Sequence, residues 1–352
     1  MITDTHWPVY GHSASVEFLH RLTCPADRRI QTNLRHAYLL LGSRQVGKRT
    51  VAEIFAKALL CTDTEQRPCG RCRSCHLFEH GNHPDVRVIK PLDKNGEVDR
   101  IGGTLRTDQA AEIVRDVVTR PMEGRYKVFI ILDLQAANDS FANKLLKTLE
   151  EPPDHAIFIL TALDRNQLLP TIVSRCQLVE LRPLAPATIA SALSAHWQAP
   201  AKQAELFSRL ARGRLGWAVQ QLTTEAEQSK RSSQLEALWQ LIESPSAERL
   251  ATAEQLNRMT DRQTLFELLE TWGTWWRDVL LVQAGCGELC SNIDEITRLT
   301  QQAASFSVHA VQQYLRTLDR VEGYLHHTVN TRLALEVLLL RAPTLETNQL
   351  LS

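Results

Sequence analysis

The chain has 352 residues, 43% of them hydrophobic, which is enough for two or three domains with apolar cores. Its 40 basic and 40 acidic residues cancel, so strong DNA binding through net positive charge is disfavoured, although a local basic stripe stays possible. No run reaches the ~18 apolar residues that a membrane span requires, and the first residues lack the pattern of a secretory signal. We therefore expect a cytoplasmic protein with no membrane partner.

The first half of the chain alternates short apolar runs with stretches of helical composition. The apolar runs predict strands at Ala37–Leu41, Val128–Leu132 and Ala156–Leu160, and Val86–Ile89 (VRVI) is a further short strand candidate. The other stretches predict helices at Val51–Leu60, Asp108–Val118 and Phe141–Leu149. This alternation is typical of a parallel α/β domain, which we expect to extend to about residue 184.

From Pro186 the pattern becomes helical. A first helical stretch runs to about Leu222, and the polar segment Thr223–Gln234 (TTEAEQSKRSSQ) is predicted to be a linker. Helical periodicity then continues over about residues 232–342. Four tryptophans lie in this part, and we expect some to be core residues and some to contact partners. They are Trp239, Trp272, Trp275 and Trp276.

A near match to a phosphate-binding loop follows the first strand. Gly42 and Gly47 have the required spacing and Lys48 comes next, so backbone N–H groups could cradle phosphates at a helix N-terminus. The following residue should carry a hydroxyl that binds Mg²⁺, but it is Arg49, which has donors only. Thr50 is rotated by ~100° around the helix and replaces it poorly. The alternative is a chance match in a tight turn.

The strand that should carry the two acidic residues of an ATPase also departs from the requirement. Val128–Leu132 is followed by Asp133 and Leu134, where an aspartate and then a glutamate are normal. In one register Leu134 replaces the glutamate, and in the other Leu132 replaces the aspartate. Because hydrolysis needs both a held metal ion and a positioned water, we expect no ATPase activity, and ATP binding is doubtful.

Four of the eight cysteines are close in sequence, namely Cys61, Cys69, Cys72 and Cys75. In a reducing cytoplasm such clustering indicates metal ligation before disulfides. Four thiolates match a structural Zn²⁺ site, whose closed tetrahedral shell leaves no position for catalysis. The alternative is four ordinary buried or free thiols. We expect the remaining four cysteines to be core residues.

Together these stretches resemble the bacterial clamp-loader family of AAA+ proteins, which includes the gamma/tau and delta-prime subunits of DNA polymerase III. The resemblance covers nearly the whole chain, and its most specific part is the pair LLKTLEEPP and SRC. The stretches that carry it are VYGH (Val9–His12), HAYLLLGSRQVGKRT (His36–Thr50), RPCGRCRSC (Arg67–Cys75), NKLLKTLEEPP (Asn143–Pro153), SRC (Ser174–Cys176), WWRD (Trp275–Asp278) and NTRLALE (Asn330–Glu336).

The resemblance implies three domains. The first, residues 1–184, is an AAA+ domain with a P-loop type parallel sheet and a zinc knuckle. The second, residues 185–225, is a small helical lid domain. The third, residues 226–345, is an all-α collar domain through which subunits assemble.

Within the resemblance, the departures concern ATP. Counting back from LLKTLEEPP places Leu132 at the family's metal-side aspartate and Asp133 at its glutamate. In GRLGWA (Gly213–Ala218), Gly216 stands where ATP-binding members carry a phosphate-contacting arginine. Three of four ATP-handling positions are thus lost, while Lys48 survives. This pattern is similar to the delta-prime type of subunit, which completes the ring without hydrolysing ATP.

The resemblance also implies a role for Arg175 and a set of partners. SRC occupies a position that faces the neighbouring subunit in AAA+ rings, so Arg175 would stabilise a γ-phosphate in trans. The alternative for Arg175 is an internal salt bridge. The implied partners are the gamma/tau and delta subunits and, through the complex, the sliding clamp and primer-template DNA. Two rival functions are an active gamma/tau-type ATPase and a zinc-dependent nucleic-acid-binding module, which the zero net charge disfavours.

Overall fold

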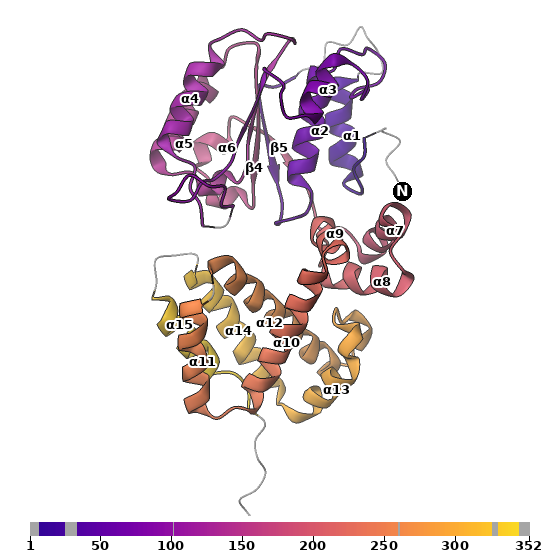
Figure 1. Cartoon of the computed structure of the whole chain (residues 1–352), viewed down its shortest axis with the longest axis vertical. Coiled ribbons are helices and arrows are strands. Elements are labelled where there is room, and N and C mark those ends of the chain that lie inside the picture. The colour runs from indigo at the N-terminus through magenta and orange to yellow at the C-terminus, as the bar shows by residue number, and fades with distance from the viewer. Residues whose placement is uncertain (1–6, 25–33, 101, 260, 326–329, 345–352) are drawn as a thin grey trace, which may run out of the picture. The chain divides into compact units, whose positions relative to one another are not determined.

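The computed structural model describes residues 7–24, 34–100, 102–259, 261–325 and 330–344, which divide into two compact units (Figure 1). Unit 1 comprises Met1–Ala192 with Gly213–Trp217, and unit 2 comprises Leu193–Arg212 with Ala218–Ser352. The outer ends of the predicted domains, residues 1–6 and 345, lie outside the described residues. The division into three domains stays a prediction.

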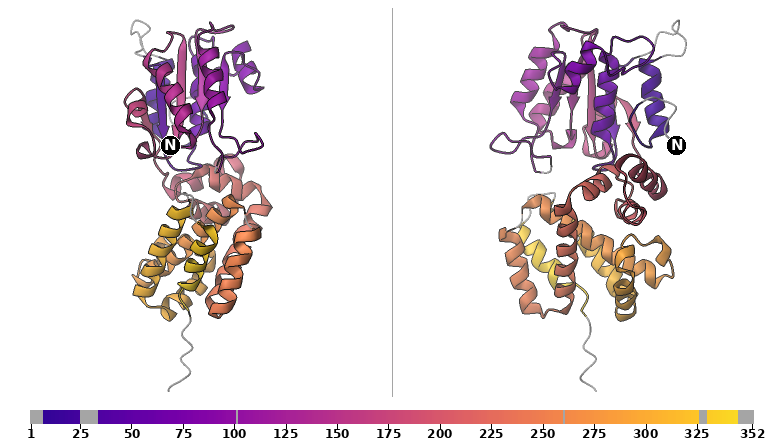
Figure 2. Two further views of the ribbon diagram at one scale, coloured as in Figure 1. Left: turned by 90° about the vertical axis from the view of Figure 1, so that its left-hand side faces the viewer. Right: turned by 45° about the vertical axis from the view of Figure 1, so that its right-hand side comes forward.

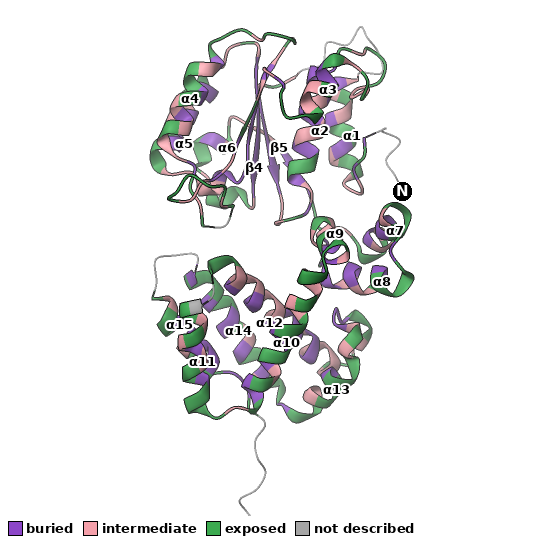
Figure 3. Ribbon diagram, in the orientation of Figure 1, coloured by how far each residue is buried: buried purple, intermediate pink, exposed green. Residues whose placement is uncertain are grey.

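Unit 1 is built on a five-stranded parallel sheet with the order β2-β3-β4-β1-β5. The strands are β1 (Ala37–Leu41), β2 (Val86–Ile89), β3 (Lys127–Ile131), β4 (Ala156–Ala162) and β5 (Gln177–Glu180). The interior strands β1, β3 and β4 are buried on both faces, as is usual for a parallel sheet (Figure 3). The predicted parallel α/β fold is confirmed.

Helices cover both faces of this sheet, because successive residues of a strand point to opposite sides (Figures 1 and 2). In β1, Tyr38 and Leu40 pack toward α1 and α2, whereas Leu39 and Leu41 pack toward α4 and α5. The helices of this part are α1 (Ser13–Thr23), α2 (Lys48–Leu60), α3 (Arg73–Glu79), α4 (Thr107–Val117), α5 (Asp139–Glu150) and α6 (Pro170–Val173).

The rest of the described chain is helical, which confirms the predicted helical C-terminal region. Its helices are α7 (Pro186–Trp197), α8 (Ala201–Leu210), α9 (Leu215–Thr223), α10 (Glu225–Glu243), α11 (Ser246–Met259), α12 (Arg262–Gln283), α13 (Ile296–Ser305), α14 (Val308–Leu325) and α15 (Thr331–Leu340). None of the helices in the described ranges has the length and apolar character needed to cross a bilayer.

The core of unit 2 gathers around α12. Trp272, Trp275 and Trp276 on this helix are at most 1% exposed and belong to one apolar cluster. Trp239 on α10 is half-buried against the same cluster, and the guanidinium of Arg298 lies 3.7 Å from its ring centroid. Three of the four tryptophans are therefore core residues, and Trp239 alone has a partly open ring.

The predicted linker at Thr223–Gln234 is wrong, because all but its first two residues belong to the long helix α10. The segment contains no Gly or Pro and is rich in Glu, Ala, Gln, Lys and Arg, which favour helix. Its polarity reflects a solvated helical surface. The carbonyl of Gln234 accepts a hydrogen bond from the indole of Trp272 at 3.0 Å, which ties this helix to the core.

Candidate functional site

The phosphate-loop sequence forms a turn between β1 and the first residue of α2. Gly42 (φ 152°) and Gly47 (φ 111°) adopt backbone conformations that favour glycine. A Cβ on Gly42 would also stand 2.4 Å from the carbonyl oxygen of Leu181. The strand, loop and helix that a phosphate-binding loop requires are therefore all present.

Lys48 is folded back onto this loop. Its Nζ donates to the carbonyl oxygens of Gly42 and Ser43 at 2.7 and 2.8 Å, and the residue is only 5% exposed. Burial lowers the pKa of Lys48 to about 8, although the nearby carboxylate of Asp133 opposes this shift. The ammonium thus uses loop carbonyls as its partners.

Two more loop carbonyls are bonded to neighbouring segments. His12 Nε2 lies 3.0 Å from the carbonyl oxygen of Val46. The N–H of Gly216 donates to the carbonyl oxygen of Gln45 at 3.0 Å. A Cβ on Gly216 would stand 2.8 Å from that same oxygen, which is closer than real contacts allow. A side chain at position 216 therefore requires the loop backbone to move.

One of the residues that follow β3, where an ATPase carries its acidic side chains, takes part in an internal ion pair. Leu132 is fully buried, and Asp133 follows it in the left-handed region (φ 54°) with 4% exposure. The N–H of Asp133 donates to Thr161 Oγ1 at 2.9 Å, which fixes the backbone there. The Nε of Arg100 donates to Asp133 Oδ2 at 2.6 Å and neutralises the carboxylate. Arg100 carried no sequence signal, because this pairing depends on how distant loops fold.

Arg49, at the position of the missing hydroxyl, points along the surface of α2. Its Nε donates to Glu53 Oε1 at 2.6 Å, one turn further along the helix. Such i,i+4 pairs on a helix surface contribute ~0.3–0.5 kcal/mol. Arg49 therefore offers no oxygen ligand to a metal ion.

The four predicted cysteines come together beside α2 and α3, with all four Sγ atoms within 4.8 Å of one another. The Sγ atoms of Cys61 and Cys72 are 3.9 Å apart. With Zn–S bonds of ~2.3 Å, the corners of a tetrahedron lie ~3.8 Å apart, so the spacing fits zinc. The eight cysteines of the chain all lie in described ranges and are free thiols. This donor set can hold a metal ion.

Backbone amides support the cysteine sulfurs. The N–H groups of Cys69, Cys72 and Cys75 donate to the Sγ atoms of Cys61, Cys69 and Cys72 respectively, each at 3.4 Å. Burial opposes ionisation of Cys72, but hydrogen bonds from the backbone of Thr62 and Cys75 lower its pKa to about 6. Burial raises the pKa of the Cys61 and Cys75 thiols, so among these three cysteines only Cys72 favours the thiolate in the absence of a metal ion.

Two contacts fasten this knuckle to the sheet domain. Ser74 Oγ lies 2.9 Å from Nε2 of buried His83, whose Nδ1 accepts the N–H of Asp85 at 3.1 Å. The guanidinium of Arg73 bridges both carboxylate oxygens of Glu123 at 3.0–3.3 Å. The imidazole of His83 thus lies outside the cysteine cluster, between Ser74 and Asp85.

Arg175 lies in the turn between α6 and β5. Its Nη1 donates to the carbonyl oxygen of Thr171, and its Nη2 pairs with Glu150 Oε1, both at 2.8 Å. The internal salt bridge considered as the alternative is therefore present. The side chains of the pair are 33% and 43% exposed, and exposed pairs contribute at most ~1 kcal/mol. The guanidinium can leave Glu150 at little cost.

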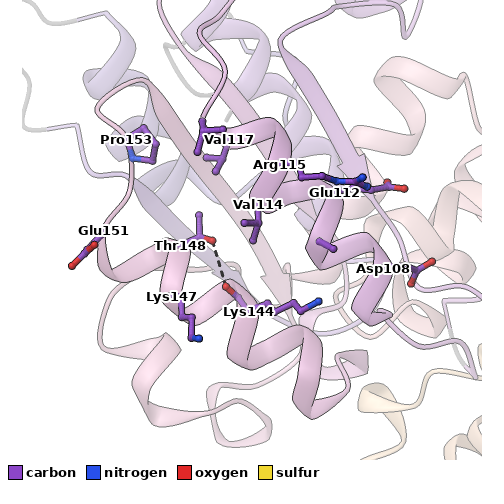
Figure 4. Close-up of a pocket in the computed structure, with 12 residues that line it drawn as sticks. Asp108, Glu112, Val114, Arg115, Val117, Lys144, Lys147, Thr148, Glu151 and Pro153 are labelled. Atoms are coloured by element: carbon purple, nitrogen blue, oxygen red, sulfur yellow. Dashed lines mark hydrogen bonds between the residues drawn. The ribbon is translucent and has the colours of Figure 1, made fainter.

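A separate groove of about 710 Å³ runs between α4 and α5 (Figure 4). Its apolar floor includes Val114, Val117 and Pro153. Within the described ranges, the charged side chains at its rim form no ion pair. They are Asp108, Glu112, Arg115, Lys144, Lys147 and Glu151. The groove shares no residue with the loop, the cysteines or the turn of Arg175.

Two family models match most of the chain. Residues 26–185 match the model described as DNA polymerase III, delta subunit, and residues 225–344 match the one described as DNA polymerase III, delta subunit, C terminal.

Two curated relatives each match less than half of the chain. Over 146 residues it is 40% identical to DNA polymerase III subunit delta' of Pseudomonas aeruginosa, covering 40% of this chain and 41% of that protein. Over 166 residues it is 35% identical to subunit tau/gamma of Haemophilus influenzae, covering 47% and 23%. Each match spans less than half of the relative.

One solved structure aligns with most of the length of the chain. It is that of a DNA polymerase III gamma subunit-related protein from Thermotoga maritima. That chain is 19% identical, with a TM-score of 0.46, and the match covers 92% of this chain and 97% of that one.

Proposed function

The chain belongs to the family of DNA polymerase III clamp-loader subunits, and on this basis we propose that it is a delta-prime-type subunit without ATPase activity of its own. Its proposed partners are the gamma/tau and delta subunits and, through the assembled complex, the sliding clamp and primer-template DNA. A cytoplasmic location and a structural zinc ion, held by the four cysteines, belong to the same proposal.

The ion pair between Arg100 and Asp133 is the observation that carries the proposal. In an ATPase of this type, acidic side chains at the end of this strand hold Mg²⁺ and position the attacking water. Here Asp133 is already neutralised at 2.6 Å, and the adjacent Leu132 has no carboxylate. A guanidinium accepts no water proton and offers no ligand oxygen. Arg49 removes the hydroxyl ligand as well.

The contact between Gly216 and the loop points the same way. An arginine at position 216 would reach the terminal phosphates of a bound nucleotide in the ATP-binding members of the family. In this chain its Cβ alone would stand 2.8 Å from the carbonyl oxygen of Gln45. The loop position that accompanies glycine is therefore incompatible with the nucleotide-sensing arginine.

Arg175 is the group that this subunit contributes in our proposal. Its planar guanidinium can donate two parallel hydrogen bonds to oxygens of a γ-phosphate held by a neighbouring subunit. Charge accumulates on those oxygens during phosphoryl transfer, so a fixed cation lowers the barrier. In the unassembled chain, Glu150 holds the guanidinium at 2.8 Å through an exposed pair that a phosphate can replace.

An active gamma/tau-type ATPase is the second candidate. It is favoured by the retained Lys48 and by the 35% identity to the Haemophilus influenzae tau/gamma subunit. The purified chain decides between the two. We expect Mg²⁺-dependent ATP hydrolysis no faster than that of Lys48→Ala. Turnover clearly above this variant would establish the gamma/tau reading instead.

The role of Arg175 is tested in a loader reconstituted with gamma/tau and delta subunits. We expect Arg175→Ala to assemble normally yet to lower the DNA- and clamp-stimulated ATPase rate. Arginine fingers contribute ~10³–10⁵ in rate where they act, but the total loss will be smaller because other sites in the ring keep theirs. Arg175→Lys should rescue little, since an ammonium lacks the planar fork.

Glu150→Gln is the matched control, because it removes the same ion pair but keeps the guanidinium of Arg175 in place. If Arg175 acts on a neighbour, Glu150→Gln should retain or raise the ATPase rate. If the pair merely braces the turn, both variants should lower the rate alike. An unchanged rate in a fully assembled Arg175→Ala loader would show that this subunit supplies no catalytic group.

A further inference from the structure

The segment Trp7–His12, here termed the N-terminal strap, touches the cysteine cluster at one end and the phosphate loop at the other. At the first end, Trp7 is 1% exposed and its Nε1 donates to the carbonyl oxygen of Arg67 at 2.8 Å. The indole packs between His20 and Phe55, with ring centroids 5.8 and 6.4 Å away. The strap is thus anchored through one hydrogen bond and one buried ring.

The carbonyl that Trp7 binds belongs to the knuckle. Arg67 lies in the loop that leaves α2 at Cys61 and returns at Cys69. This loop is closed by the cysteines themselves, since the N–H of Cys69 donates to Cys61 Sγ at 3.4 Å. A zinc ion bound to both sulfurs would fix the loop more firmly. The Arg67 carbonyl therefore lies in a loop whose two ends meet at the cysteine cluster.

The other end of the strap reaches the phosphate loop. Between the two ends, the strap forms a tight turn in which the N–H of Val9 donates to the carbonyl of Trp7 at 2.7 Å. Val9 itself is 5% exposed. His12 then adopts the left-handed conformation (φ 56°), which aims its Nε2 at the carbonyl oxygen of Val46, 3.0 Å away. The strap therefore forms one hydrogen bond with the knuckle loop at Trp7 and another contact with the phosphate loop at His12.

We propose that the N-terminal strap couples the cysteine cluster to the phosphate loop, so that zinc binding positions a loop in which the metal takes no direct part. With zinc bound, the Arg67 carbonyl holds Trp7, and His12 holds Val46. Loss of zinc releases the first contact and loosens the loop. The inference rests on the zinc site of the proposed function, and it is independent of the role of Arg175.

Hydrogen exchange of the full chain, read by mass spectrometry, tests this coupling. We expect extraction of zinc by a chelator to speed amide exchange in residues 61–80 and also in residues 7–12 and 42–47. Trp7→Phe, with zinc still bound in the same amount, should speed exchange in 7–12 and 42–47 by about fivefold, the effect of one net hydrogen bond. Trp239→Phe makes the same chemical change in unit 2 and should alter neither segment.

The outcomes separate the two claims. Native protein without zinc would contradict the metal site of the proposed function. Zinc-containing protein in which chelation affects only residues 61–80 would overturn the strap alone. If chelation also exposes β1 and β4, so that unit 1 unfolds as a whole, the zinc-bound Trp7→Phe variant decides. Unchanged exchange at residues 42–47 in that variant overturns the coupling.

Discussion

The ammonium group of Lys48 is bonded to carbonyl oxygens of the loop that precedes it. The ammonium is 5% exposed and bonded to Gly42 and Ser43. Carbonyl oxygens compensate only part of the lost hydration, so burial lowers the pKa of Lys48 to about 8. The folded chain therefore releases this proton more readily than the unfolded chain does.

This shift predicts a pH dependence of stability. Between about pH 8 and pH 10.5 the unfolded chain keeps a proton on Lys48 that the folded chain has lost, so this residue makes stability rise with pH. One pKa unit corresponds to ~1.4 kcal/mol, so the shift from 10.5 to about 8 predicts a rise of roughly 3 kcal/mol. In urea unfolding, the free energy of unfolding of wild type should rise relative to that of Lys48→Met as the pH increases through this range. A difference that stays constant would contradict it.

At the scale of elements, one arginine fastens the ends of two helices in unit 2. Arg249 on α11 is 2% exposed and forms no ion pair with an acidic residue in the described parts of the chain. Its guanidinium donates instead to four backbone carbonyls near the C-terminal ends of α10 and α15, at 2.8–3.3 Å. They belong to Ile242, Ser244, Leu339 and Ala342. Carbonyls at helix C-termini lack partners and carry partial negative charge, which makes them suitable for a cation.

Arg249→Met should therefore destabilise unit 2 strongly. It fills a similar volume but leaves buried carbonyls without the guanidinium, and a buried acceptor that loses its hydrogen bond costs ~1–3 kcal/mol. Arg258→Met on the same helix is the control, because Arg258 pairs with Glu254 at the surface and its loss should cost within ~0.5 kcal/mol. Thermal unfolding measures both. Equal unfolding temperatures for the two variants would show that the buried fork is dispensable.

The cluster of four cysteines leads to a second prediction at this scale. Native protein should contain about one zinc per chain, and Cys72→Ser should release it and destabilise unit 1, since metal binding is coupled to folding. Cys286→Ser, outside the cluster, should retain the metal. Metal analysis with calorimetry measures both effects. Carefully purified native protein that contains no zinc would end this assignment.

Features of the fold and the candidate site could be predicted from the sequence where they depend on residues that are close together along the chain. The bounds of strands β1 to β4 agree with the sequence-based prediction to within two residues. The edge strand β5 was missed, because its sequence, QLVE, mixes polar and apolar residues. The cysteine spacing predicted a cluster because its ligands are near in sequence. The Arg100–Asp133 pair and the Trp7–Arg67 contact join residues 33 and 60 positions apart, so no local pattern announces them.

At the scale of the whole molecule, unit 2 presents an apolar stripe suited to assembly. Leu333, Val337 and Leu340 on α15 are 57%, 39% and 45% exposed, and their spacing places them on one face of the helix. We expect Leu333→Asp with Val337→Asp to fold normally but to weaken assembly with gamma/tau and delta subunits. Leu289→Asp, at a site also 57% exposed, is the control. Size-exclusion chromatography that shows undiminished assembly would place the contact elsewhere.

The glycine at position 216 has an evolutionary consequence. In its present place the loop backbone fills the space of a side chain at 216, and Leu132 sits in the fully buried core where an aspartate would be an uncompensated charge. Restoring the arginine at 216 or the aspartate at 132 by itself would destabilise the fold. Restoring a hydroxyl at 49 by itself would not restore hydrolysis. Under the proposed function, a lineage that has reached this arrangement has no single-step route back to hydrolysis, so structure as well as selection keeps the activity lost.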